Sequence, residues 1–200
     1  MTLFLIALAA FAIGSIPFGY LVGRYAYNRD IREHGSGNIG AMNALRSLGK
    51  AGAVAVLLLD AAKGFVPAFF ALGHYGDGGA SVAAAAAVLG HCFSPWLRGR
   101  GGKGVATSFG AIFALNGFAG AIAVLGWIAG ALATQFSSVG SLFGSLLAPV
   151  ALYVFSYGSF PETTYGVFAL ALIAYTHREN IVRLRRGTEN PIRPGKRPIT

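Results

Sequence analysis

Long apolar runs separated by short polar segments limit this chain more than any other feature of its sequence. A membrane-spanning helix needs about 20 mostly apolar residues, because the hydrocarbon core is about 30 Å thick and a helix rises about 1.5 Å per residue. Only 12% of the 200 residues are charged, compared with roughly 25% in a soluble domain. The sequence therefore predicts an all-α integral membrane protein. The candidate transmembrane helices are 2–23, 51–73, 80–97, 105–115, 117–136, 138–157 and 162–175.

The number of transmembrane helices follows from charge. Residues 105–136 can form one long helix, or two helices that meet at the turn dipeptide Asn116-Gly117. With seven helices and an outer N-terminus, every Lys and Arg except Lys63 falls in an inner segment, as the positive-inside rule requires. Six helices would leave the basic C-terminal end outside. We therefore predict seven transmembrane helices, an outer N-terminus, a cytoplasmic C-terminus and glycine-rich cytoplasmic loops.

The first apolar run has no Lys or Arg before it and is too long for the core of a signal peptide, so we expect it to be a retained helix. Residues 1–189 are expected to form one membrane domain. Residues 190–200 are expected to form a basic, proline-rich cytoplasmic tail near anionic lipid. No internal repeat is visible, and a monomer is compatible with the sequence.

Charge and cysteine content exclude several classes of protein. A net charge of +9 suggests a nucleic-acid partner when a protein is soluble. Here the charges flank apolar runs, so we expect membrane lipid beside them and no nucleic acid. Cys92 is the only cysteine, and with His91 it gives too few ligands for a structural zinc site. Because no carboxylates cluster on the inner side, we expect no metal and no other cofactor.

The inner segment 34–43 reads His-Gly-Ser-Gly-Asn-Ile-Gly-Ala-Met-Asn. Its glycines allow positive φ angles and a close approach of backbone N–H groups to a ligand, and Ser36, Asn38 and Asn43 add polar side chains. A helix start follows, and a helix N-terminus favours an anion. Arg46 lies three residues past Asn43, so both can share a helix face, and a guanidinium suits phosphate. The segment indicates a phosphate site; a flexible linker with a chance arginine is the alternative.

A second inner segment, 98–108, reads RGRGGKGVATS. It is not a Walker loop, because Gly104 stands where Ser or Thr must follow the lysine. Its glycines can still form a nest of backbone amides around Lys103. The alternative is an ordinary basic turn, which explains the charges but not the glycines. We interpret the segment as phosphate-binding. The glycines expected to line it are Gly101, Gly102 and Gly104.

Asp60 and Lys63 lie inside an expected membrane helix, where a charge near the bilayer centre costs about 2.5–3.5 kcal/mol. Their i, i+3 spacing allows them to pair on one helix face. We interpret them as a buried structural pair that can also engage Arg46.

Two further inner segments carry polar residues. His177 and Asn180 are three residues apart on the expected final helix, and histidine is the side chain most easily set to move protons near neutral pH. Ser138 and Ser141 lie at an inner turn, where serines often only cap a helix. The histidine and the asparagine are candidates for the reaction site, and the choice between the two serines stays open.

Several of these stretches resemble the bacterial acyl-phosphate:glycerol-3-phosphate acyltransferase family. They are "GSIPFGYLVGR", "GSGNIGAMN", "LLLDAAKG", "GRGGKGVATS" and "HRENIVRLRRGTE", and they cover most of the chain from Gly14 to Glu189 in the family's order. Two positions depart from the family pattern: Met42 stands where threonine is frequent, and Arg100 where lysine is frequent.

The resemblance implies an enzyme of phospholipid biosynthesis in the bacterial cytoplasmic (inner) membrane, with its active site on the cytoplasmic side. It implies transfer of a fatty acyl group from acyl phosphate to the 1-hydroxyl of glycerol 3-phosphate, which gives lysophosphatidic acid and phosphate without acyl-CoA, acyl carrier protein or metal. The catalytic residues would be Ser36, Lys103, His177 and Asn180. The substrate-binding residues would be Asn38, Asn43, Arg46, Gly101, Gly102, Gly104 and Ser141.

Two other classes of protein compete with the enzyme. A transporter of anions or phosphate esters would also use glycines and cations, but it needs polar residues along a path to the outer side, and these helices look apolar there. A scaffold protein leaves the glycine-rich loops unexplained.

Overall fold

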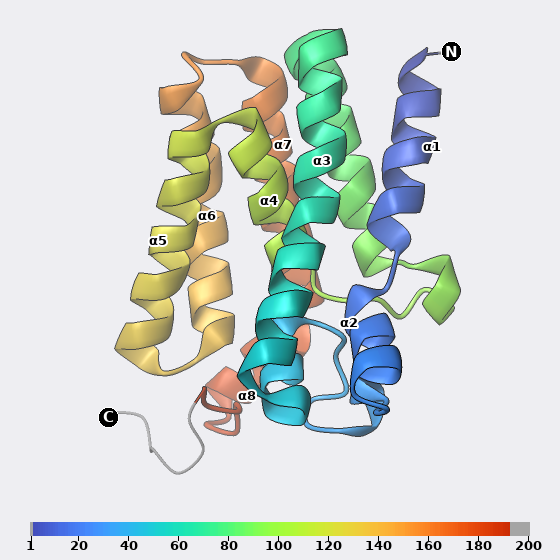
Figure 1. Ribbon diagram of the computed structural model, residues 1–200. Helices are drawn as coiled ribbons and strands as arrows, with labels where there is room; N and C mark the ends of the chain where they lie inside the picture. Colours follow the sequence, from blue (N-terminus) through green and yellow to red (C-terminus); the bar gives the residue numbers. More distant parts are fainter. Residues whose placement is uncertain (1, 193–200) are drawn as a thin grey trace.

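The computed structural model describes residues 2–192, and Figure 1 shows these residues as an assembly of helices. The main helices are α1 (Thr2–Ser15), α2 (Phe18–Leu21), α3 (Ala41–Cys92), α4 (Val105–Leu115), α5 (Gly117–Thr134), α6 (Ser137–Phe155), α7 (Phe160–Thr176) and α8 (Arg178–Arg185). Short helical turns add Val22–Ala26, Ile31–Glu33 and Pro95–Leu97. Of the predicted tail, 193–200 lie outside the described residues.

Helix α3 is divided by two glycines. The backbone leaves helical geometry at Gly49 (φ 82°, ψ −172°) and at Gly76 (φ 62°, ψ −168°). These positive φ angles favour glycine. At Gly76 the chain turns back, so α3 has a rising and a returning limb (Figure 1). The predicted helices 51–73 and 80–97 correspond to these two limbs, and the loop expected between them is a break at a single residue.

The first predicted helix, 2–23, is interrupted. Helix α1 ends at Ser15, and Pro17, which has no N–H group to donate, separates it from α2. Side chains from distant segments bind the freed backbone groups. Ser94 Oγ donates to Ser15 O at 2.6 Å, and Lys63 Nζ donates to Ile16 O at 2.8 Å.

Small residues allow the helices to pack closely. A methyl group on Gly14 would lie 2.1 Å from Ala87 O on the returning limb of α3, and one on Gly64 would lie 2.0 Å from Thr107 O on α4. Close approach through small residues is typical of helix packing in membranes. The buried core is accordingly rich in alanine. Many of the larger apolar side chains, such as Leu58, face outward.

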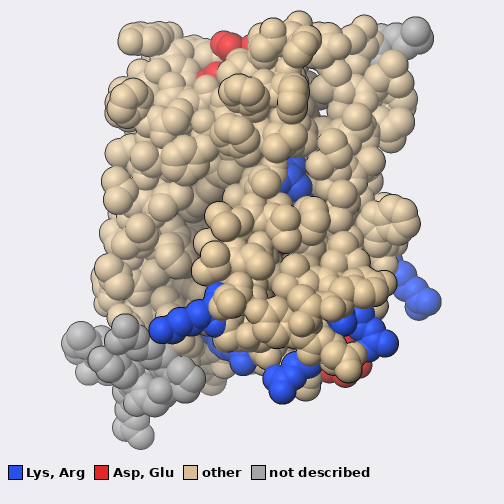
Figure 2. Space-filling view, in the orientation of Figure 1, with Lys and Arg blue, Asp and Glu red and all other residues tan. Residues whose placement is uncertain are grey.

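Among residues 2–192, four helical stretches are long and apolar enough to cross a membrane by length and composition: Thr2–Ala26, Ala41–Leu97, Gly117–Thr134 and Ser137–Phe155. The second of these contains both limbs of α3. Figure 2 shows most Lys and Arg side chains of the visible face gathered at one end, which is the end where α8 and the start of α3 lie in Figure 1. The seven-helix count and the orientation remain predictions.

Candidate active site

A pocket of about 330 Å³ lies at the basic end of the molecule. It joins three parts of the chain that are far apart in sequence: the segment before α3, the glycine-rich loop before α4, and the region of α8. Its lining residues are Ser36, Gly37, Asn38, Lys103, Glu179, Arg183 and Asn190. Three of these, Ser36, Asn38 and Lys103, are predicted site residues.

The segment before α3 is shaped by Asn43, which is almost fully buried. Asn43 Oδ1 accepts from the Ser36 N–H at 2.8 Å, and Asn43 Nδ2 donates to the carbonyl oxygens of Ile31 and Asn38, both at 2.7 Å. Asn43 therefore lies behind the segment and supports it. Ser36 is exposed at the pocket.

The glycine-rich loop is held against the end of α3. The N–H groups of Gly101 and Gly102 donate to the carbonyl oxygens of Cys92 and His91, both at 3.0 Å. The sequence predicts that these amides face a phosphate, but in the structure they are already paired because the loop lies directly on the α3 backbone. The third glycine, Gly104, has φ 83° and precedes α4.

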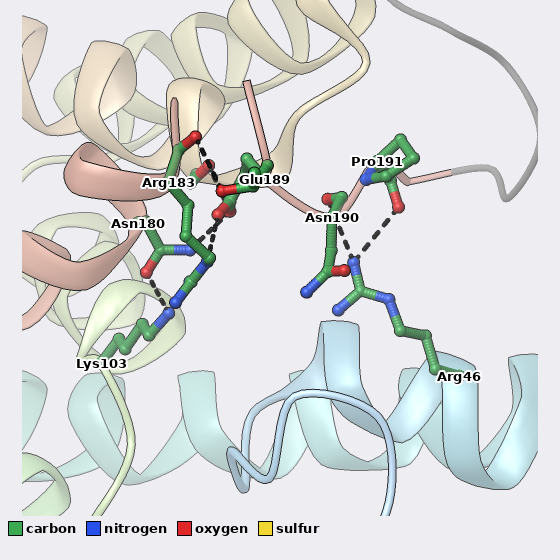
Figure 3. A network of polar contacts seen from close by, with 9 residues as sticks. Arg46, Lys103, Asn180, Arg183, Glu189, Asn190 and Pro191 are labelled. Carbon is green, nitrogen blue, oxygen red and sulfur yellow. Dashed lines mark hydrogen bonds and ion pairs between the residues drawn. The ribbon is translucent and has the colours of Figure 1, made fainter. Parts of the chain in front are cut away.

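Lys103 leads from this loop into a polar network (Figure 3). Its Nζ donates to Asn180 Oδ1, and Asn180 Nδ2 donates to Glu189 Oε1. Arg183 Nε lies 2.7 Å from Glu189 Oε2, and Ser138 Oγ donates to Glu189 Oε1 at 2.9 Å. The network connects the loop before α4 with α6, α8 and the segment that follows α8.

Burial and neighbouring charges shift the protonation of this network. Burial, together with the positive charge of Arg183, lowers the pKa of Lys103 to about 8. Burial opposes the charge of Glu189, but hydrogen bonds from Asn180, Arg183 and Ser138 outweigh it and hold the pKa of that carboxyl below its usual range. At neutral pH the lysine is still mostly charged and the carboxylate is ionised.

His177 lies at the junction of α7 and α8, so it does not share one continuous helix with Asn180 as the sequence suggested. Both residues are nonetheless buried at the same end of the molecule. His177 Nδ1 donates to Ile173 O at 2.9 Å, which leaves Nε2 with its lone pair. Burial and the charge of Lys103 lower the pKa of His177 to about 4, so its imidazole is neutral at pH 7.

Arg46 extends from the first turns of α3, exposed, on the other side of the segment that follows α8 (Figure 3). Its Nη2 donates to the carbonyl oxygens of Asn190 at 3.5 Å and Pro191 at 3.3 Å. It therefore does not engage the Asp60–Lys63 pair. Because neutral carbonyls are weaker acceptors than a phosphate, these two bonds can be exchanged for a substrate.

The two serines differ in environment. Ser138 joins the network through Glu189, whereas Ser141 Oγ donates to Ser137 O, one turn earlier in α6, at 2.9 Å. Sequence reasoning missed Glu189 and Arg183. A buried acidic residue is costly, but nothing in the local sequence indicates that Glu189 is buried. Among residues 2–192, no three His, Cys, Asp or Glu side chains lie close enough together to hold a metal ion.

A set of apolar helices with a polar, cationic pocket at one end is typical of a membrane protein that acts on anionic compounds. The sequence model of the glycerol-3-phosphate acyltransferase family matches residues 4–187. The glycerol-3-phosphate acyltransferase of Pelagibacter ubique is 42% identical over 190 residues, covering 94% of this chain and 97% of the relative. That of Dinoroseobacter shibae is 43% identical over 193 residues, covering 96% and 94%.

Two solved structures of the same family have a similar fold. The crystal structure of PlsY, an integral membrane glycerol 3-phosphate acyltransferase, in its glycerol 3-phosphate form is similar with a TM-score of 0.90, at 34% identity, over 96% of each chain. Its lysophosphatidic acid form has a TM-score of 0.89. The chain belongs to the glycerol-3-phosphate acyltransferase family. It is an integral membrane enzyme that acylates glycerol 3-phosphate to lysophosphatidic acid in phospholipid synthesis, and the transporter and scaffold alternatives are rejected.

Proposed function

We propose that the acyl donor is an acyl phosphate and that the 1-hydroxyl of glycerol 3-phosphate attacks it directly. The new ester C–O bond forms as the C–O bond to phosphate breaks, the hydroxyl proton passes to a base, and inorganic phosphate leaves. An acyl phosphate is already activated, so no covalent acyl-enzyme, acyl-CoA, acyl carrier protein or cofactor is required. The observation that carries the proposal is a cationic pocket that contains both Ser36 and Lys103, with Lys103 hydrogen-bonded to Asn180.

Lys103 is proposed to hold the phosphate of the donor. Its ammonium lies at the pocket, and α4 begins two residues later, at Val105, without a side-chain cap. The uncapped N–H groups of a helix N-terminus favour an anion. Together, Lys103 and the start of α4 can stabilise the negative charge that grows as phosphate leaves.

Arg46, Ser36 and Asn38 are proposed to orient glycerol 3-phosphate, with Ser141 as a further contact and Asn43 acting through the segment that it supports. The Arg46 guanidinium is held only by two carbonyl oxygens, which a phosphate can replace with stronger bonds. Oriented binding of two reactants can lower a barrier by about 7–11 kcal/mol.

His177 and Asn180 are proposed to position the attacking hydroxyl. The donation from Nδ1 to Ile173 O supports the tautomer whose Nε2 can accept the hydroxyl proton. The pKa lowered to about 4 keeps this imidazole neutral at pH 7 but also makes it a weak base. A substrate phosphate is the competing base. The turnover of His177→Ala with both substrates saturating decides between them, because a rate near that of the unmodified enzyme excludes His177 as the base.

The proposed setting is the bacterial cytoplasmic membrane, crossed seven times, with the basic end and the pocket on the cytoplasmic side and the N-terminus outside. There the acyl chain can stay in lipid while its phosphate meets Lys103. Residues 1–189 would form the single membrane domain and act as a monomer, with 190–200 as the tail.

The proposal is tested by measuring which acyl donor the enzyme uses. Purified enzyme is given labelled glycerol 3-phosphate with palmitoyl phosphate or, in a parallel reaction, with palmitoyl-CoA. We expect lysophosphatidic acid only from palmitoyl phosphate. Product from palmitoyl-CoA at an equal or higher rate would show that the donor is misassigned, while the acyltransferase activity itself would stand.

A further inference from the structure

A buried ionic cluster lies beneath the glycine-rich loop, outside the pocket. Lys63 Nζ is 2.8 Å from Asp60 Oδ1, and His91 Nδ1 is 3.6 Å from the same oxygen. The three side chains are between 1% and 4% exposed. The pair formed by Asp60 and Lys63 was expected from the sequence and is confirmed, but its contact with His91 was not foreseen.

The two basic members of the cluster have different tasks. Lys63 also donates to Ile16 O, so it connects α3 with the interruption after α1. His91 has no such partner on another helix. The Nδ1 edge of the ring lies 3.6 Å from Asp60 Oδ1, which is too long for a hydrogen bond, so close packing and not a bond to Asp60 holds the other edge in place.

That other edge faces the glycine-rich loop. A methyl group placed on Gly102 would lie 2.0 Å from His91 Nε2 and 2.6 Å from Cε1. Gly102 also donates its N–H to the His91 carbonyl oxygen at 3.0 Å. The residue that immediately precedes Lys103 is thus held by both the backbone and the imidazole of His91.

We propose that His91 is a positioning residue for the active site: its buried imidazole supports the backbone at Gly102 and thereby fixes where Lys103 points. From α7, Thr176 Oγ1 donates to the Lys103 carbonyl oxygen at 3.0 Å. Lys103 is therefore held between the end of α7 and the end of α3. A displacement of about 1 Å in a positioned group can cost 10²-fold in rate.

Two neighbouring glycines allow a matched experiment. Neither Gly101 nor Gly102 has a positive φ angle, so only contacts oppose an alanine at either position. At Gly102 the obstacle is the His91 side chain, which His91→Ala removes. At Gly101 the obstacles are the backbone oxygens of His91 and Cys92, 2.0 and 2.7 Å from the added methyl, which His91→Ala leaves in place.

The full-length enzyme is assayed for lysophosphatidic acid formation as Gly102→Ala, Gly101→Ala, His91→Ala and both double variants with His91→Ala. Each glycine variant is expected to lose about 100-fold in kcat/KM, the penalty of a misplaced catalytic group. Adding His91→Ala should restore Gly102→Ala about tenfold and should not restore Gly101→Ala. Melting temperatures in detergent accompany the rates, and the Gly102 double variant should melt no lower than the less stable of its parents.

Equal behaviour of the two double variants, or a Gly102 double variant less stable than both parents, overturns the inference. The inference that His91 affects catalysis rests on the proposed role of Lys103 at the acyl-phosphate site. The kinetics of the single variant His91→Ala test these two claims separately. We expect the KM for palmitoyl phosphate to rise about tenfold while the KM for glycerol 3-phosphate changes less than about twofold. A second outcome is that His91→Ala rescues Gly102→Ala but, as a single variant, raises only the KM for glycerol 3-phosphate. That outcome supports the contact between His91 and Gly102 and rejects Lys103 as the residue that binds the acyl donor.

Discussion

Two charged clusters contact the glycine-rich loop, one through His91 and Gly102 and the other through Lys103 and Asn180, and they differ in how exposed their side chains are. In the inner cluster the side chains of Asp60 and Lys63 are 2% and 1% exposed. In the outer cluster, at the pocket, Glu189 is 5% exposed but its partner Arg183 is 33% exposed. The inner charges have one another, whereas the outer cations also face a space that a substrate can enter.

This difference in exposure indicates that the inner cluster has a structural role and that the outer cluster binds substrate. Charges that are buried and matched cannot exchange partners without a large loss of stability, so they fix the backbone. Charges that are partly exposed and held by amides or carbonyls can exchange those partners for a phosphate. The loop that carries Lys103 therefore contacts one cluster that fixes its backbone and another cluster whose hydrogen-bond partners a phosphate can replace.

The largest expected effect comes from opening the inner cluster. Asp60→Asn leaves Lys63 charged and buried without a counter-ion, which should lower the free energy of unfolding by about 3–5 kcal/mol. Denaturation in detergent measures it. The double variant Asp60→Asn, Lys63→Met removes both charges and should recover much of the loss. A double variant that is no more stable than Asp60→Asn would contradict the assignment.

Next in size is the loss of the exchangeable cation. Lys103→Met should lower kcat/KM about 10²–10³-fold, the usual cost of removing one group that stabilises transition-state charge, with an unchanged melting temperature. Arg98→Met is the control, because Arg98 is an exposed basic residue of the same loop. It should cost less than about threefold. Equal losses would mean that only the net charge of the loop matters.

Deprotonating Lys103 by raising the pH should lower kcat/KM less than replacing the residue does. Because its pKa is lowered to about 8, the ammonium is present below that pH and lost above it, so kcat/KM should fall on the alkaline side of about pH 8. Arginine keeps its charge throughout this range. The Lys103→Arg enzyme, although less active, should therefore lack the fall, and an identical alkaline limb in both profiles would assign it to another group.

The smallest effect distinguishes the two serines of α6. Ser138→Ala removes a hydrogen bond to Glu189 and should cost about 1 kcal/mol of stability. Ser141→Ala should leave stability unchanged and, if Ser141 binds glycerol 3-phosphate as proposed, raise the KM for that substrate about fivefold. Steady-state kinetics and melting curves on both variants test the pair. A Ser141→Ala enzyme with an unaltered KM removes Ser141 from the site.

Helix boundaries were predicted well where a residue has one clear structural preference. Asn116 was expected to divide two helices, and in the structure its Oδ1 caps α5 by accepting from the N–H groups of Phe118 and Ala119. The interruption at Pro17 was missed because the apolar run continues through it. The turn at Gly76 was expected as a loop, because composition does not show that one glycine can reverse the chain.

The candidate site was predicted in part. Ser36, Asn38 and Lys103 do line one pocket, since glycine-rich segments with polar residues are conspicuous in an apolar chain. Glu189 was not foreseen, because its burial arises only when the segment after α8 folds back. The role of the loop glycines was predicted incorrectly. The sequence suggested that their N–H groups are free to bind a phosphate, whereas Gly101 and Gly102 lack a side chain so that the loop can lie on α3.

The bonds between Arg46 and the carbonyl oxygens of Asn190 and Pro191 matter for anyone who prepares this enzyme. They bring the C-terminal end of the described chain beside the pocket, whereas α1 begins at the far end of the molecule (Figure 1). An insertion or fusion that directly follows Pro191 would therefore lie close to where the substrates are proposed to bind. Purification handles therefore belong at the N-terminus, and activities measured with C-terminal fusions need a cleaved counterpart.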